Sequence, residues 1–449
     1  MRRLLPALRA AVLALSVLVL AGPPPLPATV EDANATRPTT AGTASATPTV
    51  SPEPTPEAGP TSTPTATPTS SPATKPAATV VPRIRPTATD ELGALLQAEL
   101  DRLRQSGGLP GVSATIVFGD GSSWTGVSGL ADVEAGVAVT PDTAFSIASV
   151  TKTFVAALTL VLAEEGRLTL DEPVVGLLPA LGLDGRITVR QLLDHTSGLH
   201  DFFLSPGIDR ALQGGRAAVW TTEQALGYVR KPYFAPGSGW HYSNTNYLLL
   251  GLLVEKVTGH SLAAALRDRF LDPLGLSTAY VQIAEAPRGP IAHGYRLGGP
   301  ESTRPPIDLS DGTAAMPFTS VVTASGAAGA LAASSVDLAR WGSLLYGGGV
   351  LAPASLAQMA APVYIESPGP SLHPYGLGVQ EIDIAGHPTL GHSGRFLGFR
   401  GAVRYLLDEE VSVAVLTNQS RIDPGTIVDV LLGLAIPELA PCLDCLVER

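Results

Sequence analysis

Two side chains that could form a catalytic pair stand close together in the segment Ser149-Val150-Thr151-Lys152, directly before an apolar run at residues 154–163 that predicts a buried helix. Residues three apart on a helix share one face, with Cβ atoms roughly 5–6 Å apart, so the lysine amine lies against the serine hydroxyl. Burial lowers the pKa of a lysine, and a partly neutral amine can remove the serine proton. The chain has only four lysines against 25 arginines, which cannot deprotonate. The alternative is structural: Ser149 caps the helix and the Lys152 amine extends to solvent.

A second group of polar side chains lies in Tyr242-Ser243-Asn244, after the turn-rich segment 235–239. In an extended loop Tyr242 and Asn244 point the same way, because side chains alternate. A phenol can accept a proton where nearby cations lower its pKa, and an amide can hold a carbonyl oxygen or an N–H group of a substrate. The alternative is a capping loop before the apolar helix predicted from Asn246, with Asn244 as the cap and Tyr242 as a packing residue.

A third candidate segment is His392-Ser393-Gly394-Arg395, which follows Gly391 in a predicted strand. Glycines in a strand let a substrate backbone approach closely. His392 would add a hydrogen-bonding group that is cationic when protonated, and the Arg395 N–H could hold a developing oxyanion. Taken alone, the segment would fit a structural strand that ends in a histidine.

In this order, the three segments resemble the motifs of the penicillin-recognising serine hydrolases, and within them the branch of class C β-lactamases, D-Ala-D-Ala carboxypeptidases and type VIII esterases. Ser149-x-x-Lys152 matches the nucleophile motif, Tyr242-Ser243-Asn244 the Tyr-x-Asn motif, and His392-Ser393-Gly394 the Lys/His-Thr/Ser-Gly motif. The resemblance covers about residues 92–420. It includes residues 192–199 and 335–341, which we interpret as structural turn and helix elements.

The resemblance implies three catalytic residues, Ser149, Lys152 and Tyr242. Ser149 Oγ attacks a carbonyl carbon and forms an acyl-enzyme, while Lys152 and Tyr242 share the general-base role and then activate water or another acceptor. The backbone N–H groups of Ser149 and Arg395 are implied to form the oxyanion hole.

The resemblance also implies a set of substrate-positioning residues: Asn244, His392, Ser393, Gly394 and Arg395. Asn244 would position the acylated side chain, and His392 would keep Tyr242 polarised. The third motif begins with histidine rather than the lysine usual in dedicated β-lactamases. A lysine holds a carboxylate as a permanent cation, whereas histidine is largely neutral at pH 7. Arg395 could supply the missing charge.

These features predict a serine hydrolase that acts through an acyl-enzyme on an amide or ester carbonyl, most simply a D-Ala-D-Ala-type peptidase or an esterase. The substrate would be a small molecule or a peptide, such as a peptidoglycan-like peptide, a β-lactam or an ester. One alternative is a class C-like β-lactamase, and another is a non-catalytic cell-wall-binding module that keeps the fold. The chain has neither the Gly-x-Ser-x-Gly segment of α/β-hydrolases nor a His-Glu-x-x-His helix, and no metal or cofactor is expected.

The elements that must position these residues predict an α+β fold of the β-lactamase/transpeptidase type. One antiparallel sheet is built from both ends of the domain and flanked by helices, with a mostly helical inserted subdomain. The predicted helices cover residues 91–105, 149–163, 246–257 and 335–346, within a mostly helical stretch over 189–274. The predicted strands cover residues 112–118, 123–128, 376–383, 389–392, 399–405 and 411–417.

The N-terminal part of the chain predicts export. Residues 1–28 have a basic start followed by about a dozen apolar residues, which fits a signal peptide and falls short of the ~20 that span a bilayer. Cleavage after Ala28 or Ala35 would fit, and an uncleaved anchor is the alternative. Residues 29–89 are mostly Thr, Pro, Ala and Ser, which predicts a disordered spacer.

Residues 90–440 are expected to form the hydrolase domain, and residues 441–449 a tail in which Cys442 and Cys445 form a small disulfide or have no role. The formal net charge of −11 and the lack of a basic cluster argue against a nucleic-acid partner. We expect a secreted or extracytoplasmic envelope protein, which the N-terminal segment could tether to the membrane or the cell wall.

Overall fold

The computed structural model describes residues 87–298, 304–363 and 374–439. The predicted signal peptide, the predicted spacer up to residue 86, and the tail with Cys442 and Cys445 lie outside the described residues. The predicted domain boundaries therefore stay predictions.

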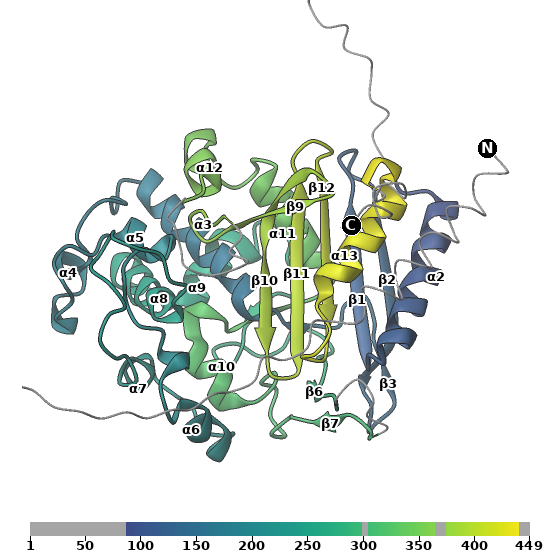
Figure 1. The fold of residues 1–449 in the computed structure, drawn as a ribbon, viewed down its shortest axis with the longest axis horizontal. Coiled ribbons are helices and arrows are strands. Elements are labelled where there is room, and N and C mark those ends of the chain that lie inside the picture. The colour runs from purple at the N-terminus through teal and green to yellow at the C-terminus, as the bar shows by residue number, and fades with distance from the viewer. Residues whose placement is uncertain (1–86, 299–303, 364–373, 440–449) are drawn as a thin grey trace, which may run out of the picture. The chain divides into compact units, whose positions relative to one another are not determined.

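A seven-stranded antiparallel sheet forms the centre of the described part, with the strand order β3-β2-β1-β12-β11-β10-β9 (Figure 1). β1 lies near the start of the described chain and β12 near its end, yet they are neighbours, with Val112 opposite Thr417. The prediction of one sheet built from both ends of the domain is therefore confirmed. The strands are β1 (Gly111–Val117), β2 (Ser123–Asp132), β3 (Val137–Ala138), β9 (Gln380–Ile384), β10 (His387–Phe396), β11 (Phe399–Leu406) and β12 (Val411–Thr417).

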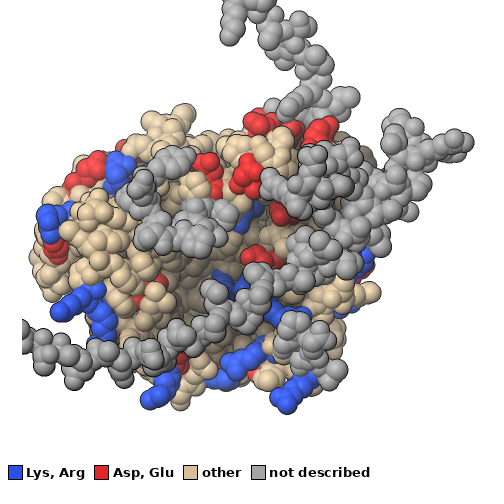
Figure 2. Space-filling model, viewed as in Figure 1, with Lys and Arg blue, Asp and Glu red and all other residues tan. Residues whose placement is uncertain are grey.

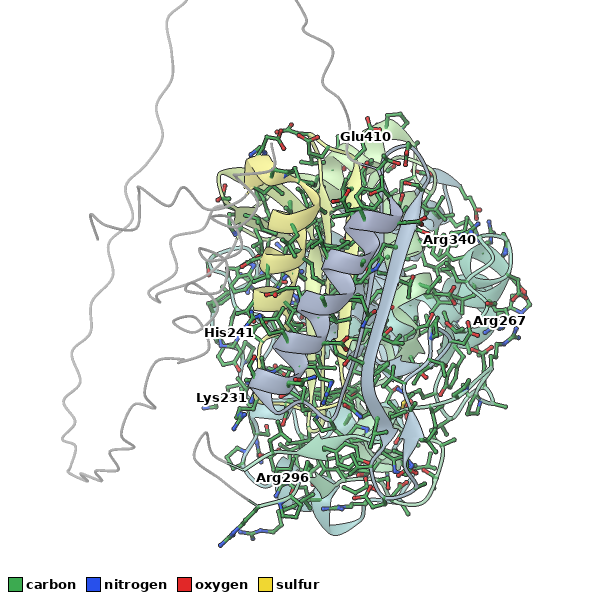
Figure 3. All side chains as sticks on the ribbon, turned by 90° about the vertical axis from the view of Figure 1, so that its right-hand side faces the viewer. Lys231, His241, Arg267, Arg296, Arg340 and Glu410 are labelled. Carbon is green, nitrogen blue, oxygen red and sulfur yellow. The ribbon has the colours of Figure 1, made fainter. Side chains whose placement is uncertain are left out.

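Two helices, α2 (Asp90–Gly107) and α13 (Pro424–Ala435), cover one face of the sheet (Figure 3). α2 begins where the Thr89 side chain accepts a hydrogen bond from the Leu92 N–H, and it ends at Gly108, whose φ of 59° is left-handed. Both helices turn an apolar stripe toward the strands, because their leucines and isoleucines recur at helical spacing. The resulting core includes Leu96, Leu100, Ile427 and Leu431 from the helices and Val413 and Val415 from β12.

The opposite face of the sheet packs against the helical insertion, which Figure 1 shows beside β10 and β11. α3 (Thr151–Glu164) and α8 (Asn244–Thr258) are buried on almost every side, as their continuous apolar sequences predict, and α11 (Ser335–Tyr346) packs directly on β12. The remaining elements are α4 (Val174–Leu177), α5 (Val189–Leu193), α6 (Ile208–Gly214), α7 (Thr222–Leu226), α9 (Leu262–Leu266), α10 (Thr319–Ser325), α12 (Pro353–Ala360), β4 (Phe145–Ser146), β5 (Tyr280–Val281), β6 (Tyr295–Arg296), β7 (Ile307–Asp308) and β8 (Leu331–Ala333).

Two expected elements differ from the structure in ways that concern the site. The helix predicted from residue 149 begins as a 3-10 turn, η1 (Ala148–Val150), and becomes α-helical at Thr151. The strand predicted from residue 376 begins only at Gln380, because Gly378 turns the chain with a φ of 77°.

In the described part of the chain, no single helix has the length and apolar composition to cross a bilayer. Only α8 together with residues 262–271 meets that criterion, as a pair bent by 77°.

Candidate active site

Ser149 lies in η1, where the chain enters the buried helix α3. The residue before it, Ala148, has a φ of 46°, a left-handed backbone conformation that residues other than glycine rarely adopt. The Val150 N–H donates to the Ile147 carbonyl and closes the turn. Strained backbone of this kind costs about 1–3 kcal/mol, so the rest of the fold must hold the turn that carries the Ser149 hydroxyl.

Lys152 is the second residue of α3 and is fully buried, and its amine donates to three acceptors. Nζ donates to Ser149 Oγ at 3.2 Å, to Asn244 Oδ1 at 2.9 Å and to the Ala328 carbonyl at 2.7 Å. Burial lowers the pKa of Lys152 to about 7, although the negative charge of Asp201 opposes this shift. A substantial fraction of the amine is therefore neutral at neutral pH and can accept the Ser149 proton.

Tyr242 and Asn244 stand on either side of Ser243, whose backbone is extended at φ −142° and ψ 118°. Both side chains reach the same amine, since Lys152 Nζ lies 4.9 Å from the centre of the Tyr242 ring and 2.9 Å from Asn244 Oδ1. The expectation that the two side chains point the same way is confirmed. Asn244 is the first residue of α8 and Ser243 is its N-cap, so Asn244 does not act as the cap.

The condition under which Tyr242 could accept a proton, a pKa lowered by nearby cations, is not met in the resting site. Burial raises this pKa well above its ordinary value, and a hydrogen bond with Ser149 offsets only part of the effect. Tyr242 is consequently protonated in the resting protein, and the group able to take a proton first is the Lys152 amine.

His392 lies on β10 and is neutral, because burial and the nearby Lys152 lower its pKa to about 3. Its Nδ1 lies 2.7 Å from the Ser393 carbonyl and must donate to it, so Nε2 accepts from the Tyr375 hydroxyl at 3.0 Å. The rings of His392 and Tyr242 are 6.3 Å apart, and the two are not hydrogen-bonded. The structure thus pairs His392 with Tyr375, which the sequence analysis missed, and it gives no direct contact by which His392 could polarise Tyr242.

Gly394 of the third motif, and Gly391 just before the motif, allow the chain to pack closely against itself. A Cβ on Gly394 would lie 2.0 Å from the Ile147 carbonyl oxygen, and one on Gly391 would lie 1.9 Å from the Val403 carbonyl oxygen. Gly394 therefore lets β10 pack directly against the turn that holds Ser149. β10, which carries Arg395, therefore contacts η1, which carries Ser149.

The charge nearest to Ser393 comes from a residue outside the motif. Arg404 on β11 is buried and donates to Ser393 Oγ, while the Ser393 N–H donates to Gln380 Oε1 at 2.9 Å. The Arg395 side chain is exposed, and its backbone lies opposite that of Arg400 in the pairing of β10 with β11. The guanidinium in contact with the third motif thus belongs to Arg404.

Asp201 is a further residue that the sequence analysis missed. It is buried beside Lys152, and its Oδ2 accepts from Asn244 Nδ2 at 2.9 Å, so that Asn244 Oδ1 faces the Lys152 amine. Burial raises the pKa of Asp201, while Lys152 lowers it. The only signal in the sequence was position, because Asp201 lies two residues after the segment 192–199 that we interpreted as structural.

The face of the molecule in Figure 2 is hollowed near the middle, where β10 meets the helical insertion in Figure 1. The part of this hollow left uncovered is lined mostly by uncharged residues. One group of described side chains, Asp132, Glu134 and His293, could hold a metal ion, with ligand atoms within 4.8 Å of one another. None of the three belongs to the motifs.

Comparisons with known proteins identify the family of the chain. The β-lactamase family model matches residues 96–433. Penicillin-binding protein 4 of Amycolatopsis lactamdurans is 31% identical over 339 residues, which cover 72% of this chain and 84% of that protein. Esterase EstB of Burkholderia gladioli is 35% identical over 240 residues, covering 49% of this chain and 58% of the esterase.

Two solved structures share the fold. The D-stereospecific amidohydrolase from Streptomyces sp. is 30% identical with a TM-score of 0.65, covering 77% of this chain and 99% of that one. The D-amino acid amidase from Ochrobactrum anthropi SV3 is 26% identical with a TM-score of 0.66, covering 77% and 98%. The chain belongs to the β-lactamase family and is a serine hydrolase of that family.

Proposed function

We propose that the protein cleaves amide bonds of D-amino acid amides or of peptides with D-residues, through an acyl-enzyme on Ser149. The observation that carries this proposal is the contact between Lys152 Nζ and Ser149 Oγ, at 3.2 Å, inside a buried site where the amine has a pKa of about 7. The amide chemistry and the D-configuration are taken from the Streptomyces and Ochrobactrum proteins, whose fold this chain shares.

In the proposed first step, neutral Lys152 accepts the hydroxyl proton of Ser149 as Oγ bonds to the carbonyl carbon. The negative charge passes to the carbonyl oxygen, which the backbone N–H groups of Ser149 and Arg395 would hold. When the carbon–nitrogen bond breaks, Tyr242 donates its proton to the leaving amine and takes one back from protonated Lys152. A water molecule then attacks the acyl carbon, with the same groups moving protons in the opposite direction.

The third motif begins with an uncharged residue, because His392 is neutral. The nearby cations are Arg404, which is buried and donates to Ser393 Oγ, and Arg395, whose side chain is exposed. A dedicated β-lactamase usually has a lysine, a permanent cation, at the position of His392, so we place efficient β-lactamase activity below amidase activity. The second candidate is an esterase, which the 35% identity to EstB favours.

We also propose that the protein is exported. Support comes from the basic and apolar composition of residues 1–28 and from the Thr- and Pro-rich sequence that follows. Expression of the full chain in a bacterial host, followed by mass analysis of the medium, envelope and cytoplasm, tests this. Recovery of the full-length chain only from the cytoplasm would contradict export.

The test of the proposed reaction compares the wild-type protein with Ser149→Ala and with Ser106→Ala, a control that removes an exposed hydroxyl on α2. Each protein is incubated with D-phenylalanine amide, its L-enantiomer, p-nitrophenyl acetate and benzylpenicillin, and protein mass and product are followed. We expect hydrolysis of the D-amide by the wild type and Ser106→Ala, and a rate at least ~10³-fold lower for Ser149→Ala.

Each outcome has a distinct meaning. Ester hydrolysis without amide hydrolysis would favour the esterase, and loss of benzylpenicillin at a comparable rate would favour the β-lactamase. If no substrate or fluorophosphonate probe adds mass at Ser149, the chain is a binding module rather than an enzyme.

A further inference from the structure

His195 lies in the segment 192–199, outside the three motifs, yet it is fully buried against Tyr242. The centres of the two rings are 4.4 Å apart. The backbone of His195 has a φ of 66°, a left-handed conformation that is uncommon for residues other than glycine, although asparagine, aspartate and histidine adopt it more often than the rest.

The residues before and after Tyr242 both donate their backbone N–H groups to His195. The His241 N–H donates to the His195 carbonyl at 3.2 Å, and the Ser243 N–H donates to His195 Nδ1 at 3.2 Å. One residue therefore holds the chain immediately before and immediately after the tyrosine.

The neighbours of the ring also fix its protonation state. Asn246 Oδ1 accepts from Ser197 Oγ at 2.7 Å, which turns Asn246 Nδ2 toward His195 Nδ1 at 3.2 Å. Two donors thus point at Nδ1, so the ring proton must sit on Nε2. Burial, together with the charge of Lys152, lowers the pKa of His195 far below its ordinary range, which keeps Nδ1 free to accept.

We propose that His195 is a positioning residue that sets the Tyr242 hydroxyl for proton transfer at Ser149. Its carbonyl holds the backbone N–H of His241, and its side chain holds the backbone N–H of Ser243. The proposal rests on the proposed function. Tyr242 lies two residues before α8 begins at Asn244, so the hydrogen bonds of the helix do not hold the Tyr242 backbone in position. A displacement of about 1 Å at a reacting group can cost about 10²-fold in rate.

Three substitutions separate the task of the side chain from the strain of the backbone. His195→Asn keeps an acceptor on Cγ, where Nδ1 stands, and tolerates the left-handed conformation. His195→Gly removes the strain but also the acceptor, and His195→Leu fills space without an acceptor. The readouts are kcat and KM for the substrate that the wild type turns over best, the rate of fluorophosphonate labelling at Ser149, and Tm.

We expect His195→Asn to keep kcat within about 10-fold of the wild type, and His195→Gly and His195→Leu to lose about 10²-fold or more in kcat with KM changed little. Rescue by asparagine alone, in variants that keep a cooperative thermal transition, is a result that a purely structural role would not give. A glycine variant as active as the asparagine variant would overturn the proposal, since relief of strain would then suffice. An asparagine variant that folds but is as slow as the glycine variant would overturn it too. A wild-type protein that neither turns over a substrate nor labels at Ser149 would instead contradict the proposed function.

Discussion

At the scale of single residues, the site depends on one amine and on the charges that face it. Lys152 is surrounded by the neutral rings of His195, His392, Tyr242 and Tyr247, and Asp201 is the carboxylate that raises its pKa. Because burial dominates, the amine still has a pKa of about 7. As the proposed base must be neutral, kcat/KM is expected to rise as the pH increases through about 7.

Replacing Asp201 by asparagine should move this rise to lower pH. The substitution keeps an oxygen that can accept from Asn244 Nδ2 but removes the negative charge that favours protonated Lys152. The pKa of Lys152 then falls, and we expect the midpoint of the acid limb of kcat/KM to drop by about one pH unit. Asp209→Asn, at an exposed position on α6, is the matched control. A midpoint that stays in place or moves upward in Asp201→Asn would show that Lys152 is not the titrating base.

The residues of the candidate site could be proposed from the sequence, because a serine and a lysine three apart, followed by a Tyr-x-Asn segment, are seldom found together for another purpose. Their electrostatics could not be predicted. The protonated state of Tyr242 and the neutral state of His392 follow from burial, which depends on residues distant in the sequence. Tyr375, the partner of His392, lies 17 positions before it and has no motif of its own.

At the scale of elements, the contact between β10 and η1 sets the geometry of the nucleophile and the third motif. It depends on Gly394, whose missing side chain leaves room for the Ile147 carbonyl. The neighbouring strand offers a comparison at Gly401, which pairs directly with Gly394. A Cβ on Gly401 would lie 2.7 Å from a methyl carbon of Leu416, a flexible side chain, and 3.8 Å from the Val415 carbonyl oxygen, an ordinary contact distance.

Gly394→Ala should therefore impair catalysis far more than Gly401→Ala. The new methyl group must push β10 away from η1, which displaces the Arg395 N–H from the proposed oxyanion hole. We expect a loss of ~10²–10³-fold in kcat for Gly394→Ala. Both variants should lose about 1–3 kcal/mol of unfolding free energy from overpacking, measured by urea titration. Equal kinetics of the two variants would argue against an oxyanion role for this part of β10.

The elements themselves could largely be predicted from apolar periodicity. The helix at 335–346 and the strand at 411–417 have the predicted bounds, because each is an uninterrupted amphipathic or buried run. The missed start of β9 and the 3-10 turn at Ala148 depend on backbone conformations with positive φ, at Gly378 and at Ala148. Such conformations are imposed by tertiary contacts rather than by local periodicity.

At the scale of the whole molecule, the described residues form two hydrophobic cores, one on each face of the sheet. α13 covers the smaller core, which also contains α2. Ile427, Val428, Leu431 and Leu432 of α13 are buried there. Burying one such side chain stabilises a protein by about 1.5–3 kcal/mol, so these four together rival the roughly 5–15 kcal/mol that keep a domain folded.

A chain that stops after Ile422 should therefore fail to fold cooperatively, although it retains every residue of the proposed site. A chain that stops after Leu439 is the matched control, since it keeps α13. We expect the shorter chain to be insoluble or to lack a urea transition, while the control keeps both the transition and the activity. A soluble and active shorter chain would show that α13 is dispensable.

The pairing of β1 with β12 has a consequence for biosynthesis. A ribosome releases β1, Ser149 and the helical insertion long before it makes β10 and β12, so the middle of the sheet cannot close until residues 411–417 have been made. Until then a nascent chain carries the proposed nucleophile without the strand that would complete the proposed site. If the proposed site is correct, acyl transfer can begin only after β10 and β12 have emerged.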